Sequence, residues 1–464
     1  MIMKNMKKLA VVLFLAITGS AVAQDKIARI DSVFTAMHAK KQFNGNVLIA
    51  EKGNVVYQKS FGLRNEETKE ALDANSIFEL ASVSKQFTAM GIVLLEEKGK
   101  LKYDDKLSKF FPELGFYKDV TVRHLLNHTG GLPDYMELME KHWDHNHIAT
   151  NKDVISLFAT VKPAPVFSAG TKYEYSNTGY ALLASIIEKA SGMTYADLLK
   201  KSIFIPLKMD NTFVYTRRYA PKEVKNYAYG YITDLAGKKV LPDNFAQTNM
   251  VVWLDGIVGD GTVNSTTGDL LKWDRALYSD KLVSKKSREL IFSIPVLPNG
   301  EKTGYGFGWI IENNKDFGRI AMHTGGWPGY HTFIEREMDN DKTIIVLQNN
   351  DTETRMPANT LRRLLYGLPL NVKRQEAVVP EDKMKTYIGE YELAPGYAMQ
   401  ITYDNGLKTQ LPGQQRFDLF PESETKFFLK VVDAQVEFFK DDIGNVDRIV
   451  LYQNGREMPA KKIK

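Results

Sequence analysis

Residues 81–88 of this chain read Ala81-Ser82-Val83-Ser84-Lys85-Gln86-Phe87-Thr88. They open a run, 84–97, in which apolar residues recur at helical spacing. Side chains three positions apart lie on one face of a helix, so Ser82 and Lys85 are predicted to lie side by side at a helix N-terminus. There the lysine can help to remove the serine proton, and the unpaired N–H groups of the first turn can stabilise an oxyanion. The stretch therefore predicts a serine nucleophile that needs neither metal nor cysteine.

The Ser-x-x-Lys spacing has little weight by itself. It recurs at Ser423-Glu424-Thr425-Lys426, where the pattern is that of a strand and the two side chains face opposite sides. A single match of this kind is more often a capped surface helix than a catalytic pair. The assignment of Ser82 depends on the other polar elements of the chain.

The N-terminus has the pattern of a secretory leader. Three lysines, Lys4, Lys7 and Lys8, precede an apolar run that is followed by small residues ending at Ala23. We predict a signal peptide over residues 1–23 and hence an exported protein, periplasmic or secreted. The apolar run is shorter than the about 20 residues of a membrane span, and we expect no stable membrane insertion. The chain has no cysteine, which excludes a lipid anchor, disulfides and thiol catalysis.

Charge and length restrict the function further. The formal net charge is +5, and the loss of the three leader lysines leaves +2, with no dense basic cluster. Binding of nucleic acid is therefore disfavoured. With 44% hydrophobic and 25% charged residues the composition is that of an ordinary globular protein. A mature chain of roughly 440 residues is too long for one compact core, and two domains or more are expected.

The order of the expected elements favours an α+β fold. Residues 25–40 are predicted to be a helix and residues 45–62 a hairpin, and a helix-rich stretch follows over about 104–220. Later segments have strand character, namely 309–312, 319–322, 332–334 and 343–347. Another helix is predicted after them, over 355–366. Strands at both ends of a helical insertion suggest one antiparallel sheet built from both chain ends, flanked by helices in an α/β/α arrangement.

The C-terminal part differs in composition. Residues 369–383 are rich in proline and charge and are predicted to be a linker. Beyond it, short alternating segments separated by turn residues predict a small antiparallel barrel or sandwich over 384–464. The expected domains are thus the leader, a main domain over 24–368, the linker and this all-β domain.

A serine–lysine enzyme needs a second proton-handling group, an amide and a strand that holds the acyl group. Tyr175-Ser176-Asn177 offers a phenol and an amide two positions apart, which face the same side of an extended loop. Three triplets could supply the strand: His128-Thr129-Gly130, Lys302-Thr303-Gly304 and His323-Thr324-Gly325. Only the last combines an edge-strand setting with following glycines that let a substrate approach the backbone.

Together these elements resemble the penicillin-recognising serine hydrolases, a family that includes class C β-lactamases, D,D-peptidases and related esterases. The resemblance covers about residues 25–365, and the elements occur in the family's order. It implies a β-lactamase/transpeptidase-like fold, with Ser82 as nucleophile and with Lys85 and Tyr175 as general base and acid. It also implies that Asn177 positions Lys85 and the substrate. His323 would contact a substrate carboxylate or act through hydrogen bonds. The oxyanion hole and substrate binding would involve Ser82, Thr324, Gly325 and Gly326.

One departure bears on the substrate. The third element carries histidine where most β-lactamases carry lysine, and histidine is only partly charged near neutral pH. This favours peptidase or esterase work on small peptides, including peptides with D-residues, or on esters. A class C-like β-lactamase and a non-catalytic penicillin-binding sensor or scaffold stay open as alternatives. If Lys302 were the third element, the argument would not hold.

Remaining features suggest no other chemistry. The histidines of residues 141–147 match no strong zinc pattern and are expected in a solvated loop, so we expect no metal and no cofactor. Arg217-Arg218 is expected at the surface rather than as a carboxylate anchor. The C-terminal domain resembles the lipocalin-like barrel that follows the catalytic domain in some family members. The expected partner is a small-molecule or peptide substrate, and the oligomeric state does not follow from the sequence.

Overall fold

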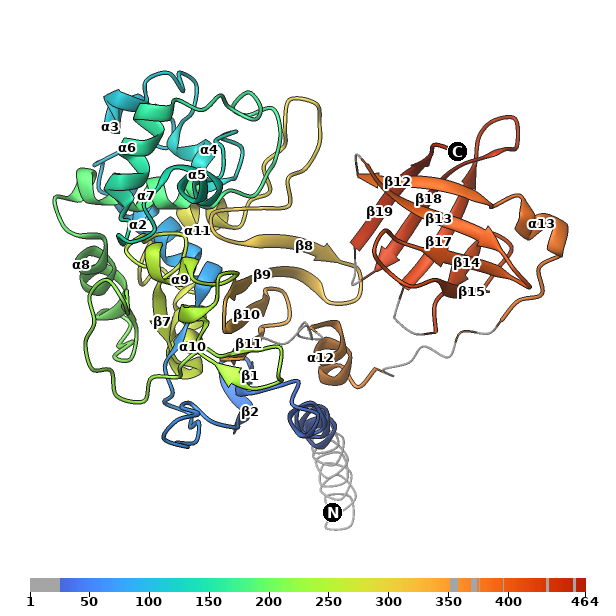
Figure 1. The fold of residues 1–464 in the computed structure, drawn as a ribbon, viewed down its shortest axis with the longest axis horizontal. Coiled ribbons are helices and arrows are strands. Elements are labelled where there is room, and N and C mark those ends of the chain that lie inside the picture. Colours follow the sequence, from blue (N-terminus) through green and yellow to red (C-terminus); the bar gives the residue numbers. More distant parts are fainter. Residues whose placement is uncertain are drawn as a thin grey trace, which may run out of the picture. The chain divides into compact units, whose positions relative to one another are not determined.

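The computed structural model describes residues 26–350, 358–368, 374, 376–394, 396–430, 434–453 and 456–464 (Figure 1). The predicted leader lies outside these residues. The chain divides into two compact units, one formed by Ile27–Met356 and the other containing Pro357–Lys464. Helices with the length and apolar composition of a membrane span are absent from the described part of the chain.

A six-stranded antiparallel sheet forms the centre of the first unit, in the order β2-β1-β11-β10-β9-β8. Its N-terminal hairpin is β1 (Gly45–Glu51) and β2 (Asn54–Phe61). The other four strands are β8 (Ile310–Asn314), β9 (Gly318–Trp327), β10 (Tyr330–Glu337) and β11 (Lys342–Gln348). Because β1 pairs along its whole length with β11, the two ends of this unit meet in one sheet, as the sequence predicts.

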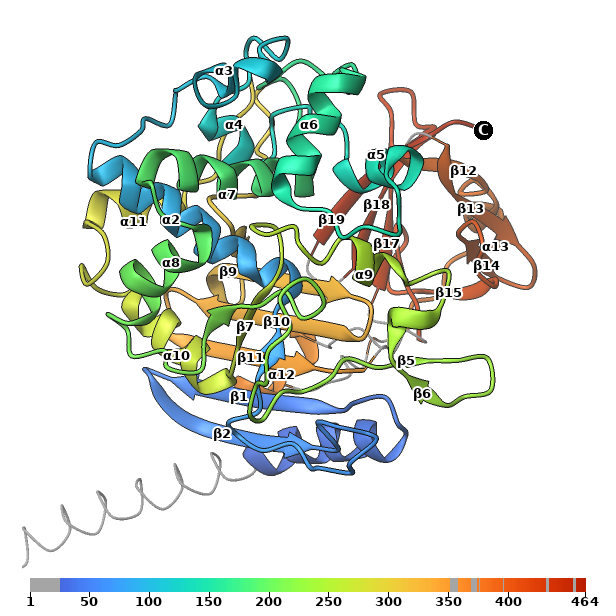
Figure 2. The same ribbon diagram turned by 60° about the vertical axis from the view of Figure 1, so that its left-hand side comes forward.

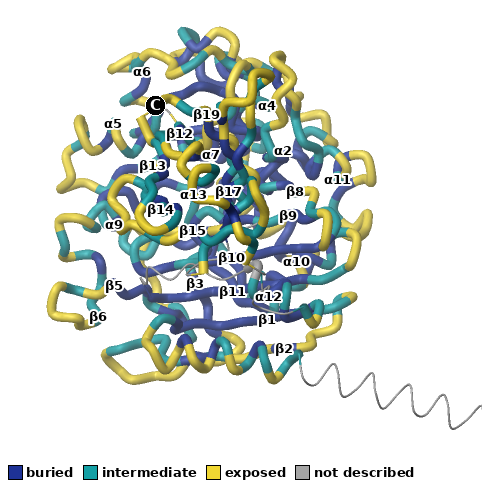
Figure 3. Tube along the Cα trace, turned by 90° about the vertical axis from the view of Figure 1, so that its right-hand side faces the viewer, coloured by how far each residue is buried: buried dark blue, intermediate teal, exposed yellow. Residues whose placement is uncertain are grey.

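Both faces of the sheet are covered. Alternate residues of β1 point to opposite faces, so that Leu48 and Ala50 join the main core while Val47 and Ile49 are buried on the other side. The helix over residues 26–39 covers that second side, where the ring of Phe34 lies 4.9–6.4 Å from three other aromatic rings, those of Phe43, Tyr57 and Phe61. Figure 3 shows the inner strands β1, β10 and β11 as buried.

The main core lies between the sheet and a group of helices (Figure 2). Its central helices are α2 (Lys85–Glu97) and α7 (Asn177–Ser191), which pack against each other, and α10 (Thr267–Ala276), which packs on β1 and β11. Shorter helices surround them: α3 (Leu107–Phe110), α4 (Val122–Leu126), α5 (Tyr135–His142), α6 (Asn151–Val161), α8 (Tyr195–Leu199), α9 (Met250–Trp253) and α11 (Lys285–Ile291).

Two small sheets complete this unit. One has the order β3-β7-β4, with β3 (Phe78–Glu79), β7 (Val263–Ser265) and β4 (Phe213–Val214), and the other is the pair β5 (Ile232–Thr233) and β6 (Lys239–Val240). Strand β3 leads directly into the turn that carries Ser82, so that β7 and its loop are held next to that turn. The α+β fold class predicted from the sequence is confirmed.

The second unit contains a closed eight-stranded antiparallel barrel, coloured orange to red in Figure 1. Its strands are β12 (Gly389–Ala394), β13 (Tyr397–Tyr403), β14 (Leu407–Gln410), β15 (Phe417–Pro421), β16 (Lys426–Phe428), β17 (Ala434–Lys440), β18 (Val446–Gln453) and β19 (Arg456–Lys462). Tyr387, Tyr391, Phe427 and Phe438 fill its interior with stacked and edge-on rings. Of the two predicted architectures, a barrel and a sandwich, the barrel is confirmed.

Two helices of this unit precede the barrel. Helix α12 (Ala358–Leu365) falls within the predicted helix over 355–366, although the residues before Ala358 lie outside the described chain. Helix α13 (Glu381–Lys385) begins inside the segment that was predicted to be a linker.

Candidate active site

Ser82 lies on a strained turn between a strand and a helix. Strand β3 ends at Glu79, and Ala81 adopts a φ of +47°, a left-handed conformation that is unfavourable for any residue with a Cβ atom. The residues Ala81–Ser84 form one 3₁₀ turn, and helix α2 continues from Lys85. Such strain is typical of functional sites, and here it places the Ser82 hydroxyl at the start of a helix whose first N–H groups are unpaired within the helix.

The ammonium group of Lys85 is surrounded by oxygen acceptors. Its side chain is fully buried, and Nζ lies 3.1 Å from Ser82 Oγ, 2.8 Å from Asn177 Oδ1 and 2.8 Å from the backbone oxygen of Asp260. An ammonium has three N–H donors, so these three oxygens match its capacity. The predicted contact between Ser82 and Lys85 is therefore present in the geometry, together with a third acceptor that the sequence did not indicate.

Tyr175 and Asn177 reach the same place from the start of α7. Ser176 caps this helix by accepting a hydrogen bond from the Gly179 N–H, and the residues on either side of Ser176 point to the Lys85 side chain. The ring centroid of Tyr175 lies 5.0 Å from Lys85 Nζ, within the range of a cation–π contact, and 39% of the residue is exposed. The structure therefore gathers Ser82, Lys85, Tyr175 and Asn177 around one ammonium group.

The third predicted element lies inside β9 rather than at its end. Strand β8 pairs with β9 only up to Met322, so residues 323–327 have β10 on one side and no strand on the other within the described chain. Along this edge Thr324 and Gly326 are exposed while His323 and Gly325 are buried. The edge setting predicted for the triplet is thus local, because an inner strand becomes an edge halfway along its length.

The two glycines of this edge, Gly325 and Gly326, serve different purposes. A Cβ atom on Gly325 would lie 2.2 Å from both the Leu80 backbone oxygen and Thr332 Oγ1, so glycine lets β9 pack on the turn that carries Ser82. A Cβ atom on Gly326 would meet nothing within 4 Å, so the space beside it is open. Access of a substrate to the backbone therefore concerns Gly326, whereas Gly325 is required by packing.

His323 is a buried, neutral ring. Its Nδ1 lies 2.7 Å from the Thr324 backbone oxygen, which only accepts, so Nδ1 carries the proton and Nε2 accepts a hydrogen bond from the Tyr305 hydroxyl at 2.8 Å. Burial, together with the positive charge of Lys85, lowers the pKa of His323 to about 3. Of the two roles considered for His323, contact with a substrate carboxylate as a cation does not fit this environment, and action through hydrogen bonds does.

His128 is a second buried histidine of the site, and it is enclosed by a hydrogen bond and by aromatic rings. Its Nδ1 accepts a hydrogen bond from the Ser176 N–H at 3.0 Å, which places the proton on Nε2, an atom without a hydrogen-bond partner among the described residues. Its ring lies 4.3 Å from the rings of both Tyr175 and Tyr305. Burial, followed by the charge of Lys85, holds the pKa of His128 well below its usual value. The triplet His128-Thr129-Gly130 thus packs against the Tyr175 loop and does not form an edge strand.

The other candidates of the sequence lie elsewhere. Lys302 is exposed in an irregular segment that forms a single bridge with Val296. The histidines of the 141–147 segment form no cluster with acidic side chains that could hold a metal ion, and such clusters are absent from the rest of the described chain. His145 is stacked on Trp253 at 4.2 Å instead.

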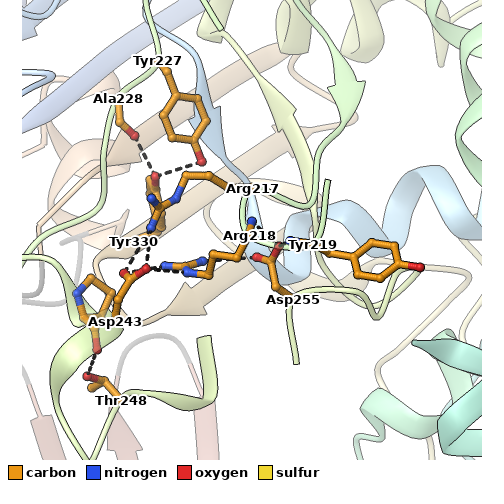
Figure 4. A network of polar contacts seen from close by, with 10 residues as sticks. Arg217, Arg218, Tyr219, Tyr227, Ala228, Asp243, Thr248, Asp255 and Tyr330 are labelled. Carbon is orange, nitrogen blue, oxygen red and sulfur yellow. Dashed lines mark hydrogen bonds and ion pairs between the residues drawn. The ribbon is translucent and has the colours of Figure 1, made fainter. Parts of the chain in front are cut away.

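Arg217 and Arg218 are not simple surface residues, and that expectation was wrong. Arg218 forms ion pairs with Asp243 at 2.7 Å and with Asp255 at 3.2 Å, and Arg217 binds Asp243 as well (Figure 4). The backbone N–H groups of Arg218 and Tyr219 also donate to Asp255. The network joins three segments of the loop region that precedes β7, and no local sequence pattern reveals partners that lie 25 and 37 positions away.

Comparison of the sequence with known families assigns both parts of the chain. Residues 30–367 match the family described as Beta-lactamase, and residues 373–462 match a domain of unknown function, DUF3471. Penicillin-binding protein 4* of Bacillus subtilis (strain 168) is 46% identical over 452 residues, which is 95% of this chain and 100% of that protein. The putative penicillin-binding protein PbpX of the same organism is 27% identical over 66% of this chain and 71% of its own length.

Solved structures agree with the fold. An octameric penicillin-binding protein homologue from Pyrococcus abyssi has a TM-score of 0.66 and 27% identity, and the match covers 94% of this chain and 100% of that one. A D-amino acid amidase from Ochrobactrum anthropi SV3, complexed with L-phenylalanine, has a TM-score of 0.58 and 22% identity over 75% of this chain and 98% of its own, which shows a shared fold.

Proposed function

Because this chain belongs to the β-lactamase family, we propose that it is a serine hydrolase that works through an acyl-enzyme on Ser82. The observation that carries the proposal is the Ser82 Oγ–Lys85 Nζ distance of 3.1 Å, in a site where Nζ is also bound by Asn177. The strained turn and the open space beside Gly326 support it, because a nucleophile must be both oriented and accessible.

In the proposed reaction, Ser82 Oγ attacks the carbonyl carbon of an amide or ester while its proton passes to the Tyr175–Lys85 pair. The N–H groups of Ser82 and Gly326 bind the oxyanion. The bond from carbon to the leaving nitrogen or oxygen then breaks, and the pair returns the proton to the leaving amine or alcohol. Water, deprotonated by the same pair, cleaves the ester on Ser82 and restores the hydroxyl.

The proposed substrates are small peptides, including peptides with D-residues, or esters. The neutral, doubly hydrogen-bonded His323 supports this choice over an antibiotic, because it offers no cation for the carboxylate of a penicillin. The fold shared with a D-amino acid amidase is compatible with a substrate of this class.

Covalent binding of penicillin is the second proposed function. It is supported by the 46% identity to a penicillin-binding protein across nearly the whole chain. In this version Ser82 opens the β-lactam ring, and the rate of the following hydrolysis decides whether the protein acts as a β-lactamase or as a slowly cleared sensor. We also propose export, for which the leader-like sequence of residues 1–23 is the support.

A substrate panel tests these proposals. Nitrophenyl esters, D-amino-acid amides, D-Ala-D-Ala peptides and a chromogenic cephalosporin are offered to the wild type and to Ser82→Ala, and acylation by a fluorophosphonate is followed by mass spectrometry. Turnover of an ester or amide that Ser82→Ala loses supports the hydrolase. Rapid turnover of the cephalosporin alone favours the β-lactamase, a stable penicillin adduct without turnover favours the sensor, and neither turnover nor label contradicts catalysis.

A further inference from the structure

Tyr305 is a fully buried residue beside the proposed active site, and no role has been assigned to its hydroxyl, which lies 2.8 Å from His323 Nε2. We propose that Tyr305 is a positioning residue for the oxyanion hole. Its hydroxyl fixes the tautomer of His323, and His323 in turn fixes the edge of β9 that carries Gly326. The inference rests on the proposed function, because it specifies how that site orients one of its oxyanion donors.

The segment that carries Tyr305 is held in place at three points. The side-chain amide of Asn127 donates to the backbone oxygens of Tyr305 and Gly306 at 3.3 and 3.2 Å. Tyr305 also forms a bridge with Ile310 at the start of β8. Gly308, with a φ of +78°, packs on the start of α2, where a Cβ atom would lie 2.9 Å from two backbone atoms. The position of the Tyr305 hydroxyl is therefore set by contacts of its own main chain and segment.

The hydrogen bonds from Tyr305 to β9 run in one direction. The backbone oxygen of Thr324 only accepts, so the 2.7 Å contact places the proton of His323 on Nδ1. Nε2 then offers a lone pair, which accepts from the Tyr305 O–H. Burial raises the pKa of Tyr305 well above its usual value, so the hydroxyl keeps the proton that it donates. Without this donor the proton of His323 is free to move to Nε2, and the Thr324 oxygen then loses its hydrogen bond.

The Thr324 carbonyl and the Gly326 N–H lie on one edge of β9. In a β-strand the C=O of one residue and the N–H of the residue two positions later point to the same side. In the proposed reaction the Gly326 N–H faces the substrate, where residues 323–327 have no neighbouring strand within the described chain. The Nδ1–H of His323 therefore takes the place of a neighbouring strand for the Thr324 oxygen. By holding this carbonyl, it sets the direction in which the next N–H on the same edge points.

His323 neither gains nor loses a proton in this role. Burial and the charge of Lys85 lower the pKa of His323 to about 3, so the ring is neutral near neutral pH. The other titratable groups around the ring, among the described residues, are His128, Tyr175 and Tyr305, and none of them is a carboxyl group that would favour the imidazolium. The ring is thus suited to transmit a position rather than a charge.

The test compares acylation by a nitrophenyl ester in Tyr305→Phe and in the matched control Tyr103→Phe, both in the full chain. Tyr305→Phe removes the hydroxyl and keeps the ring. Tyr103 is also buried, and its ring lies 5.3 Å from that of Phe307 in the same segment, but its hydroxyl has no hydrogen-bond partner among the described residues. Acylation by Tyr103→Phe is therefore expected to equal that of the wild type.

The expected loss in Tyr305→Phe lies in the rate constant of acylation. Single-turnover measurements should show a decrease of roughly tenfold, smaller than the about hundredfold to thousandfold loss that follows removal of a whole oxyanion donor. The dissociation constant of the ester should not change, because the oxyanion hole acts in the transition state. Phenylboronic acid forms a tetrahedral anion on a serine hydroxyl, and its inhibition constant should rise by the same factor as the acylation rate falls.

The tautomer of His323 provides a readout that a general disturbance of the fold would not give. The histidine rings are labelled with ¹⁵N, and the His323 signals are assigned with His323→Gln. The wild type should carry the proton on Nδ1 from pH 5 to 8, and Tyr305→Phe should show a mixture of both tautomers. If Tyr305→Phe does not fold, the wild type alone decides, since a proton on Nε2 contradicts the inference.

Three other outcomes would overturn the inference. They are an unchanged tautomer in Tyr305→Phe, an acylation rate in this variant equal to that of the wild type, and equal losses in Tyr305→Phe and Tyr103→Phe. Absence of acylation in the wild type would instead refute the proposed function. The two failures are distinguishable, because the tautomer of His323 is measured without any activity.

Discussion

The Nζ atom of Lys85 and the Oδ1 atom of Asn177 lie 2.8 Å apart, although 92 positions separate them in the sequence. The contact crosses from the start of α2 to the start of α7, and both side chains project from first turns. The amide thus sets where the ammonium points, and through it the position of the Ser82 hydroxyl.

Loss of this amide is expected to separate activity from stability. Asn177→Ala removes a hydrogen bond to a charged group, worth roughly 1.5 to 3 kcal/mol, and should lower kcat/KM roughly tenfold to hundredfold. Ser176→Ala is the matched control, because Ser176 caps the same helix without touching Lys85. It should cost about 1 kcal/mol of stability and leave acylation nearly unchanged. Ester kinetics and thermal melting of both variants provide the test, and equal losses of activity would contradict the assignment.

Substitution of the two adjacent glycines should give opposite results. Gly325→Ala brings a methyl group against the Leu80 carbonyl and Thr332 Oγ1, and the overlap must displace either β9 or the turn before Ser82. A loss of about 1 to 3 kcal/mol in stability and a large loss of acylation are expected. Gly326→Ala enters open space and should leave the melting temperature unchanged, with its effect confined to KM. A Gly325→Ala protein with wild-type melting and acylation would show that the strand does not support the nucleophile turn.

Much of the fold could be predicted because its signals are local. The 45–62 hairpin and the later strands alternate in hydrophobicity, and the helical spacing after Ser84 locates α2 to within one residue. The pairing of β1 with β11 followed from the general rule that strands at both ends of a chain close one sheet over a helical insertion.

The contacts that complete the site could not be predicted, because they depend on where the chain returns after long excursions. The backbone oxygen of Asp260 binds Lys85 across 175 positions, and a carbonyl oxygen leaves no mark in the sequence. Tyr305 meets His323 because the segment before β8 turns back on the start of that strand, where Tyr305 forms a bridge with Ile310. The ion pairs of Arg218 could not be predicted for the same reason, because its two acidic partners belong to separate turns of one loop region.

The buried histidines should make the protein sensitive to acid. In the folded protein the pKa of His323 is lowered to about 3 from 6.5, so the unfolded chain binds one proton more between these values. The stability that a neutral His323 contributes is therefore complete above pH 6.5 and decreases as the pH falls toward 3, by at most about 1.4 kcal/mol per pH unit. His323→Gln should flatten the plot of melting temperature against pH in this range. His147→Gln, whose side chain is 73% exposed, should leave it unchanged, and equal slopes in wild type and His323→Gln would refute the neutral state.

Arg217 and Arg218 are expected to contribute unequally to stability through the ion network before β7. Arg218 binds both Asp243 and Asp255 with a side chain only 13% exposed, whereas Arg217 has Asp243 as its one ion-pair partner among the described residues (Figure 4). Arg218→Met leaves Asp255 without an ion-pair partner in the described chain and should cost roughly 3 kcal/mol. Arg217→Met leaves Asp243 paired with Arg218 and should cost less than about 1 kcal/mol. Melting of both variants measures the difference. Because the network joins segments that lead to Asp260 and β7, Arg218→Met should also slow acylation at temperatures where the protein is folded. A destabilised variant with an unchanged acylation rate would show that this loop region does not support the site.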